Sequence, residues 1–164
     1  MAKTKIRTEL LHRTDRAIRE ASAQGALLSS AVAAHLCITQ NDIECLDLIN
    51  LNGPMTAGKL AETTGLTTGA ITGIVDRLAK AGFVRREADP ADRRRVIVRV
   101  REGSGARIKP LYDSLQRRIG EVLAGYSDKE IALLARFYEK SAEILREETL
   151  HLREPASRRG RGRP

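Results

Sequence analysis

The sequence predicts a mainly α-helical protein with a small β wing, in which a winged helix-turn-helix is flanked by long helices. Two short amphipathic patterns separated by Gly65 predict the helix-turn-helix. The pattern then changes from a helical period to a β-type run, which indicates a hairpin directly after the second short helix. Long stretches of good helix formers lie on both sides, and 164 residues suffice for one domain with a core or two small lobes sharing one.

The N-terminal part, residues 1–38, is predicted to be one long helix. Residues 5–35 are mostly good helix formers with apolar residues at roughly helical spacing, and Gly25 is a candidate interruption. Thr39 can cap the next helix, because a threonine hydroxyl accepts a hydrogen bond from a free N–H of the first turn. The apolar side of that helix is formed by Ile43, Leu46 and Ile49, and Asn52-Gly53-Pro54 ends it.

Residues 39–101 are predicted to form the winged helix-turn-helix lobe. Thr56 is expected to cap the first short helix, with Leu60 and Ala61 on its buried face, and Thr67 to cap the second. The second helix has an apolar stripe at i, i+3, i+4 and i+7, made of Ile71, Ile74, Val75 and Leu78, and it ends at Ala81-Gly82. The β-type runs "FVRRE" and "RRVIVRV" then flank the turn-rich "ADPAD".

The rest of the chain is predicted to contain two more long helices and a basic tail. The helices cover about 104–124 and about 128–150, within the segment 102–152, and Ser127 with Glu130 forms a capping box for the second. Residues 153–164 hold almost nothing apolar and are expected to be disordered. The long helices carry more apolar surface than one small lobe can cover, so we interpret residues 1–38 and 102–152 as dimerisation helices.

The positive charge of the chain is concentrated in two places. The net charge is +8, and residues 53–101 hold ten basic and five acidic residues, while residues 151–164 hold five and one. A basic lobe containing a helix-turn-helix and a hairpin indicates DNA binding, because small side chains let a helix approach base edges and wing cations meet phosphates or the minor groove. The predicted DNA-contacting residues are Thr67, Thr68, Gly69, Thr72, Gly73, Arg77, Arg93, Arg94 and Arg95.

Other functional classes find little support in the sequence. There is no nucleophile motif, phosphate loop or cluster of carboxylates and histidines, so we expect neither an enzyme nor a cofactor. His35, Cys37 and Cys45 match no zinc-ligand spacing, so we expect no metal and interpret both cysteines as small buried residues. The chain shows no apolar run of membrane length and no signal-peptide pattern, which favours a cytoplasmic protein without membrane contact.

From about Leu36 to Gly105 the sequence resembles the MarR (multiple antibiotic resistance regulator) family of bacterial transcription factors. The resemblance lies in "CITQNDIECLDLI" and in "LAETTGLTTGAITGIVDRLAKAGFVRREADPADRRRVIVRV". Three short motifs of the family are present. They are Asp76-Arg77-Leu78 in the second short helix, Gly82-Phe83-Val84 at the entry to the wing, and Asp92-Arg93-Arg94 at the wing tip.

The resemblance implies a homodimer that binds a pseudo-palindromic operator in double-stranded DNA, with half-sites about one helical turn, ~34–36 Å, apart. It implies a repressor that a small, often phenolic, ligand or an oxidant releases from DNA. It places Arg94 in the minor groove, and it gives Asp92 and Asp76 the role of bracing the wing through neighbouring arginines.

This chain departs from the family at several points. Gly73 stands where the family often has a base-reading arginine, and Arg101-Glu102 replaces the usual Leu-Thr, so that Ser104 is a candidate cap for the following helix. Aromatic residues are few, which leaves Tyr112 and Tyr138 as the candidate rings of a ligand pocket whose position the sequence does not indicate.

The basic tail leaves two interpretations open. Its "GRGRP" ending resembles the core of AT-hook peptides, which lie along A·T-rich minor grooves, whereas a solubilising tail would add only non-specific phosphate attraction. The tail residues concerned are Arg158, Arg159, Arg161 and Arg163. The second short helix is also poor in base-reading side chains. The alternative to a sequence-specific regulator is therefore an architectural, nucleoid-type protein of low sequence specificity.

Overall fold

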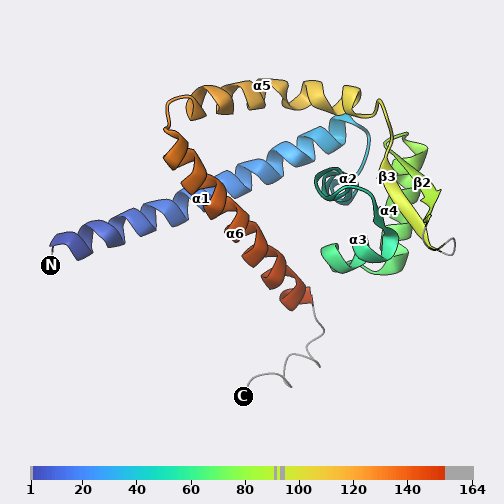
Figure 1. Cartoon of the computed structure of the whole chain (residues 1–164), viewed down its shortest axis with the longest axis horizontal. Helices are drawn as coiled ribbons and strands as arrows, with labels where there is room; N and C mark the ends of the chain where they lie inside the picture. Colours follow the sequence, from blue (N-terminus) through green and yellow to red (C-terminus); the bar gives the residue numbers. More distant parts are fainter. Residues whose placement is uncertain (1, 91, 93–94, 154–164) are drawn as a thin grey trace, which may run out of the picture. The chain divides into compact units, whose positions relative to one another are not determined.

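A computed structural model describes residues 2–90, 92 and 95–153, and the contacts divide the chain into two compact units, Met1–Glu44 and Cys45–Pro164 (Figure 1). The first unit contains helix α1, Ala2–His35, and the start of helix α2, Gln40–Asn52. The second contains the rest of α2, the winged helix-turn-helix and two long helices. No single described helix is long and apolar enough to cross a membrane; α1 from Thr4 and α2 pass together as a bent pair, by length and composition only.

Helix α1 is continuous, so Gly25, the candidate interruption, does not break it. Its C-terminal end is closed by backbone hydrogen bonds from the N–H of Cys37 to the carbonyl of Ala34 and from the N–H of Ile38 to that of Ala33. Cys37 takes the left-handed conformation there, with φ of 56°, and its side chain is exposed. The prediction of two buried cysteines is therefore wrong for Cys37, because this residue lies in a solvent-facing turn just after α1. The prediction is confirmed for Cys45.

The N-terminus of α2 is capped as its sequence predicts. The Thr39 hydroxyl accepts a hydrogen bond from the backbone N–H of Asp42, and the Asp42 carboxylate accepts one from the N–H of Thr39. These two bonds satisfy donors that a helix N-terminus otherwise leaves free. The predicted apolar side of α2 is confirmed, because Ile43, Leu46 and Ile49 are all buried.

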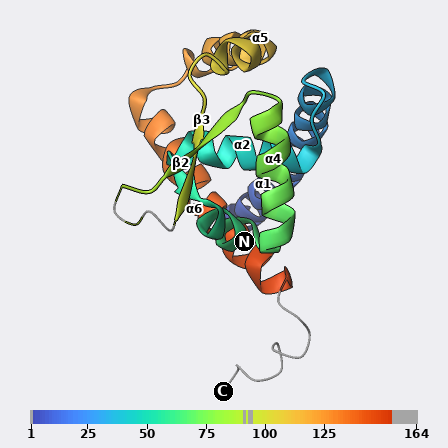
Figure 2. The ribbon, with the colours of Figure 1, turned by 90° about the vertical axis from the view of Figure 1, so that its right-hand side faces the viewer.

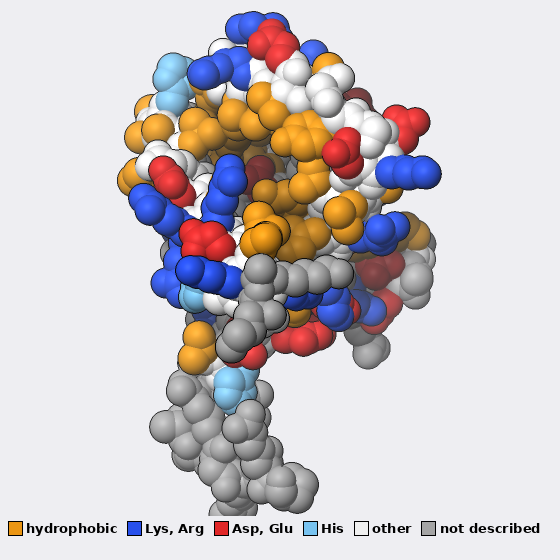
Figure 3. Space-filling view, turned by 90° about the vertical axis from the view of Figure 1, so that its left-hand side faces the viewer, with side chains coloured by type: hydrophobic (Ala, Val, Ile, Leu, Met, Phe, Trp, Pro, Cys, Tyr) orange, Lys and Arg blue, Asp and Glu red, His pale blue; other side chains and the backbone are white. Residues whose placement is uncertain are grey.

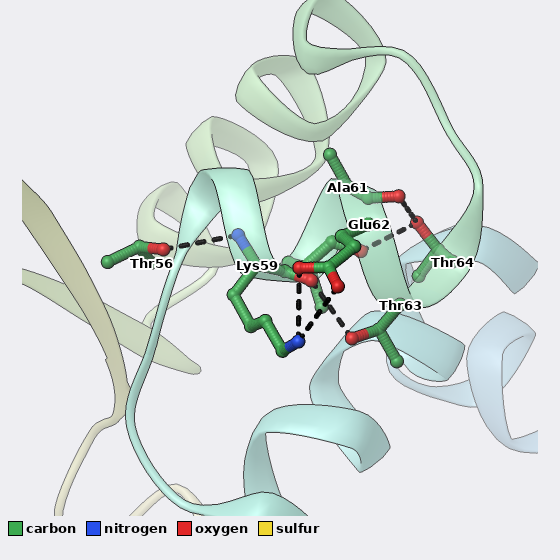
Figure 4. Close-up of polar contacts among 7 residues, drawn as sticks. Thr56, Lys59, Ala61, Glu62, Thr63 and Thr64 are labelled. Atoms are coloured by element: carbon green, nitrogen blue, oxygen red, sulfur yellow. Dashed lines mark hydrogen bonds and ion pairs between the residues drawn. The ribbon is translucent and has the colours of Figure 1, made fainter.

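Helix α3, Ala57–Thr64, and helix α4, Thr68–Lys80, form the predicted helix-turn-helix. Thr56 accepts a hydrogen bond from the N–H of Lys59, and Thr67 accepts one from that of Ala70, so both predicted N-caps are confirmed. Figure 4 shows the first of these caps, together with the Thr63 and Thr64 hydroxyls bonded to backbone carbonyls of α3. Between the helices, Gly65 has φ of 67°, a conformation that glycine adopts without steric cost.

The wing belongs to a three-stranded antiparallel sheet with the order β1-β3-β2. Strand β2, Val84–Ala88, pairs with β3, Val96–Val100, from Val84 opposite Val100 to Ala88 opposite Val96. Strand β1, Met55–Thr56, pairs with the other edge of β3 and is not foreseen by the sequence pattern. Because β1 leads directly into α3, this pairing attaches the start of the helix-turn-helix to the wing, which lies beside α4 (Figure 2).

The lobe has a compact apolar core. The stripe predicted on α4 is confirmed, because its four residues are at most 2% exposed. They are buried with Leu60 of α3 and with Phe83, Val84 and Val98 from the sheet region. Burying side chains of this size contributes roughly 1.5–3 kcal/mol each, so this core is what fixes α4 against the wing.

Helix α5, Gly105–Leu123, and helix α6, Asp128–Arg153, complete the chain. The predicted capping box of α6 is confirmed, since the Glu130 carboxylate accepts hydrogen bonds from the N–H and hydroxyl of Ser127. Ser104 stands at the start of α5 but makes no side-chain cap bond, because its hydroxyl donates to the carbonyl of Arg101 instead. Neither α5 nor α6 contains a buried residue.

Candidate nucleic-acid interface

The outer face of α4 carries small side chains and hydroxyl groups. Thr67, Thr68, Gly69 and Thr72 are all exposed, opposite the buried stripe that holds the helix in place. The hydroxyl of Thr67 is engaged as the N-cap, and that of Thr72 donates to the carbonyl of Thr68 at 2.9 Å. A helix with so little side-chain bulk on one side can enter a major groove, which is about as wide as a helix.

Two glycines on this face differ in what surrounds them. A Cβ added at Gly69 would meet no atom within 4 Å, so the packing of this chain does not require glycine there. A Cβ added at Gly73 would lie 3.5 Å from Nη1 of Arg77. The guanidinium of Arg77 therefore extends along α4 toward Gly73. This places its positive charge near the middle of the helix.

The arginines on the strands of the wing are held by carboxylates. Arg85 and Arg99 stand directly opposite each other in the β2–β3 ladder, a like-charge pairing that is unfavourable by itself. The Glu87 carboxylate forms an ion pair with each of them, with its oxygens 2.7 Å from Nε of Arg85 and 3.1 Å from Nε of Arg99. This carboxylate offsets the repulsion and orders two arginine side chains on one face of the hairpin.

Asp76 connects α4 to the wing. Its carboxylate lies 2.6 Å from Nη1 of Arg86 in β2. Both side chains are about half exposed, at 56% and 41%, so the pair contributes only about 0–1 kcal/mol to stability. Its main effect is orientation, because it links the outer part of α4 to a strand that leads to the wing tip.

Only part of the wing tip is described. The N–H of Asp89 donates to the carbonyl of Arg95, and the N–H of Arg95 donates to that of Asp92, both at 2.9 Å. The Arg95 side chain points toward the carboxylate of Asp89, with 4.0 Å between Nε and Oδ2. Arg93 and Arg94 lie outside the described residues, as do the tail residues Arg158, Arg159, Arg161 and Arg163.

One contact at the base of the lobe was missed by sequence reasoning. Arg107, in the first turn of α5, donates from Nη1 to the carbonyl of Ala81 at 2.8 Å, and its guanidinium carbon lies 4.3 Å from the centre of the Phe83 ring. Ala81 is the C-cap of α4, and a cation at a helix C-terminus is favoured by the helix dipole. Arg107 thus joins α5 to the end of α4, across 26 positions of sequence that no local pattern could bridge.

A pocket of about 400 Å³ lies between the second half of α2 and the start of α5. Its lining includes Leu46, Leu51, Val100, Ile108, Lys109 and Tyr112. Burial, and secondarily the negative charge of Asp47, raise the pKa of Tyr112, so its phenol is neutral near pH 7. Of the two candidate pocket rings, Tyr112 is in this pocket, whereas Tyr138 is exposed on α6 and packs edge-on against Phe137.

The described residues contain no group of three or more His, Cys, Asp or Glu side chains arranged to hold a metal ion. Neither Cys37 nor Cys45, both described by the structure, takes part in a disulfide. The described surface of α4 and the wing offers hydroxyls, backbone groups and arginines paired with carboxylates. This is the kind of surface that contacts phosphates and base edges.

Comparison with known proteins agrees with this geometry. The family model described as "MarR family" matches residues 38–96. The chain is 37% identical to the uncharacterized HTH-type transcriptional regulator YcgE of Bacillus subtilis, over 94% of this chain and 100% of that protein. It is 33% identical to the HTH-type transcriptional repressor NicR of Pseudomonas putida, over 62% and 70%. The structure is similar to that of a mutant of E. coli MarR complexed with operator DNA, with a TM-score of 0.51, 25% identity, and 77% and 91% coverage.

Proposed function

Because this chain belongs to the MarR family of helix-turn-helix transcriptional regulators, we propose that it is a cytoplasmic, homodimeric, sequence-specific repressor of transcription. The observation that carries this proposal is the exposed face of α4, with its hydroxyls, glycines and Arg77, set beside a wing whose strand arginines are ordered by Glu87 and Asp76. The helix would read base edges in the major groove, while the wing tip, with Arg94 foremost, would enter the neighbouring minor groove.

The dimer is supported by a difference between two sides of α6, one of which packs against the same chain while the other is left exposed. Leu150 and Arg153, near its end, lie beside Gly65 of the same chain, where an added Cβ would be 3.5 Å from Cδ2 of Leu150 and 2.8 Å from Cδ of Arg153. Phe137 lies thirteen residues before Leu150, which at 3.6 residues per turn puts it about 140° away around the helix. The side that carries Phe137 and Ile144 is left exposed, at 40% and 49%, although it is strongly apolar.

A second copy of the chain is the occupant we propose for this side. Figure 3 shows hydrophobic side chains gathered in a broad area, with charged ones around it. The large exposed hydrophobic residues of α5 and α6 include Leu115, Ile119, Val122, Ile131, Leu133, Phe137, Ile144 and Leu145. Patches of this kind mark protein–protein interfaces, and a two-fold dimer would also give the two reading helices that a pseudo-palindrome requires.

A small-molecule effector would bind in the pocket between α2 and α5. That pocket combines apolar walls with the Lys109 ammonium, the Tyr112 hydroxyl and the Asp47 carboxylate, which suits a small, partly apolar molecule with one or two polar groups. Arg107 follows Gly105 and precedes Ile108, which both line the pocket, and it is bonded to the end of α4. A ligand that shifts the first turns of α5 would therefore change the position of α4.

The test is a titration of the purified protein against its own upstream promoter DNA and against shuffled DNA, at near-physiological salt. We expect tighter binding to the promoter by ~10³-fold or more, as specific DNA-binding proteins show. Arg94→Ala should weaken promoter binding by about 1–3 kcal/mol. The matched control is Arg117→Ala, which removes the same charge from α5, where Arg117 pairs with Glu121.

Equal affinity for both DNAs would contradict the regulator and favour the architectural alternative. An equal weakening of promoter binding in Arg94→Ala and Arg117→Ala would mean that net charge, rather than the wing, determines affinity. Reporter transcription in a strain lacking the protein distinguishes a repressor, whose removal raises expression, from an activator, whose removal lowers it.

A further inference from the structure

The C-terminal end of α4 is tied to the start of α5 by a closed ring of hydrogen bonds. The backbone N–H of Arg101 donates to the carbonyl of Phe83 at 2.8 Å. The carbonyl of Arg101 accepts from the hydroxyl of the buried Ser104 at 2.7 Å and from its N–H at 3.1 Å. The N–H of Arg107 then donates to the Ser104 carbonyl at 3.1 Å, and the Arg107 guanidinium returns to the carbonyl of Ala81 at 2.8 Å. The segment that begins α5 is therefore fixed at both of its ends to the residues that follow α4.

The bond at Ala81 occupies a position that a helix by itself leaves open. The last carbonyls of a helix have no partner within it, and the helix dipole concentrates negative charge there. The turn after α4 serves Arg77 and Leu78, whose carbonyls accept from the N–H groups of Ala81 and Phe83. The carbonyl of Ala81 is served by the Arg107 guanidinium, which also lies 4.3 Å from the centre of the Phe83 ring. One side chain of α5 thus holds the end of α4 by a charge-assisted bond and by stacking.

Arg107 lies far from the surface proposed to read DNA. Figure 2 shows the end of α4 that leads into β2 on the same side of the lobe as the start of α5. Helix α4 has 13 residues, so at 1.5 Å per residue its two ends are about 20 Å apart. A pivot of about 10° at Ala81 would therefore move Thr68, at the other end, by about 3–4 Å. A hydrogen bond to a base edge is lost over a much smaller displacement.

We propose that Arg107 is a positioning residue for sequence reading, which sets the angle of α4 in the major groove without touching DNA itself. This inference rests on the proposed DNA-binding function. Contacts to base edges carry the sequence preference and depend on this angle, whereas attraction to phosphates is independent of sequence and tolerates a change of angle. Because α5 belongs to the proposed dimerisation helices, the same bond would also fix each reading helix relative to the second copy.

The experiment compares the wild-type protein with Arg107→Met and Arg107→Gln, on promoter and shuffled DNA, at salt concentrations between about 50 and 200 mM. Both variants remove the charge, and the glutamine side chain is too short to reach Ala81. We expect promoter affinity to fall at least ~10-fold, comparable to the cost of a mismatched base pair, and affinity for shuffled DNA to change less than about twofold. The slope of log affinity against log salt should change by less than about 0.5, because no phosphate contact is removed.

Two further variants separate this role from charge and from stability. Arg117→Met removes the same charge from α5, where Arg117 pairs with Glu121, and should keep the promoter preference. Arg107→Lys keeps a cation and a donor at the helix C-terminus and should retain the preference to within about threefold of the wild type. Thermal unfolding is measured for every variant, and the exposed position of Arg107 means that all of them should fold. A merely structural role would lower the unfolding temperature but leave the promoter preference unchanged.

Unchanged promoter preference in Arg107→Met and Arg107→Gln would overturn the inference, whatever their unfolding temperatures. Equal weakening on both DNAs, with a salt slope lower by about 1, would also overturn it, because Arg107 would then be a phosphate contact. So would an equal loss of preference in Arg107→Lys and Arg107→Met, since the bond to Ala81 would not be what matters. These outcomes differ from failure of the proposed function, in which the wild-type protein itself would show no preference for promoter DNA.

Discussion

The winged helix-turn-helix lobe and the pair α5–α6 differ in where their apolar side chains go. In the lobe, Leu78 and Phe83 are completely buried within one chain. In α5 and α6 no residue is buried, and Phe137 and Ile144 remain 40% and 49% exposed. The lobe is therefore stabilised by its own core, whereas the long helices have amphipathic faces that one chain leaves uncovered.

The two regions therefore differ in what stabilises them. A helix without buried residues gains little from packing, and isolated helices are only marginally stable in water. In the proposed dimer, association with a second copy would stabilise the long helices and would also set the distance between two lobes. Arg107 lies at the junction, since it belongs to α5 but contacts Ala81 and Phe83 of the lobe.

The largest effect is expected from Phe137→Glu, which places a carboxylate on the exposed apolar side of α6. It should convert the proposed dimer to a monomer, as measured by sedimentation or light scattering. Linking two binding modules raises overall affinity by about 10²–10⁴-fold, so promoter affinity should fall by roughly that factor. The lobe itself should remain folded, because its core does not include Phe137.

The matched control for this variant is Ala132→Glu. Ala132 is also exposed on α6 and lies five residues before Phe137, which places it about 140° away around the helix. It should remain dimeric and keep its promoter affinity. Dissociation of both variants to the same extent would show that any added carboxylate destabilises α6, and the apolar side would lose its assigned role.

The next largest effect is expected from Phe83→Ala, in the core of the winged helix-turn-helix lobe. Removing a fully buried phenylalanine leaves a cavity and costs about 3–5 kcal/mol. It also removes the ring on which the Arg107 guanidinium rests.

The destabilisation should be measured by urea unfolding at fixed protein concentration, with Val96→Ala as the control. Val96 is 46% exposed in β3 of the same sheet, so its truncation should cost less than about 0.5 kcal/mol. Similar destabilisation in both variants would contradict a core centred on Phe83.

A smaller effect is expected from Gly69→Ala, which should raise the stability of the protein and lower its affinity for promoter DNA. The added methyl group meets nothing within 4 Å, and alanine is favoured over glycine in helices by up to about 1 kcal/mol. The variant should therefore unfold at a higher temperature but bind promoter DNA more weakly, because the methyl group would occupy the face proposed to meet the bases.

Gly120→Ala on α5 is the control for this prediction. Gly120 is exposed and a Cβ there also meets nothing within 4 Å, so the substitution should stabilise the helix without changing the intrinsic contact between α4 and DNA. Unchanged DNA affinity in Gly69→Ala would mean that this part of α4 does not approach the duplex closely.

Much of the lobe could be predicted from its sequence because local patterns determine it. The caps at Thr56 and Thr67 and the left-handed turn at Gly65 each depend on a few neighbouring residues, and the α4 stripe depends on helical periodicity. Strand β1 was missed because two residues are too few to show alternation. Its pairing with β3 depends on contacts across about forty positions of sequence.

The unpredicted contacts of the site share one physical reason. That Asp76 pairs with Arg86 rather than another wing arginine, and that Arg107 covers Phe83, depends on how side chains meet after the elements have packed. Cys37 shows the same limitation at a helix end. Glycine usually occupies the left-handed position that follows a helix, and nothing in the local sequence indicated that a cysteine would take it and face solvent.

The smallest effect is expected from Glu130→Gln at the start of α6, where stability depends on local bonds because no residue of that helix is buried. The hydrogen bonds from Ser127 lower the pKa of Glu130 below its ordinary value of 4.5. A carboxyl group whose pKa is lower in the folded protein adds stability above its unfolded pKa and loses it as pH falls through the folded pKa. The wild-type protein should therefore unfold at a slightly higher temperature than Glu130→Gln at pH 7, and the difference should disappear as the pH falls below 4.5. Glu139→Gln, which removes the same charge from an exposed position of the same helix outside the capping box, is the control variant measured in parallel. A difference that persists in acid would mean that the capping box acts through geometry that glutamine cannot reproduce, rather than through the charge of the carboxylate.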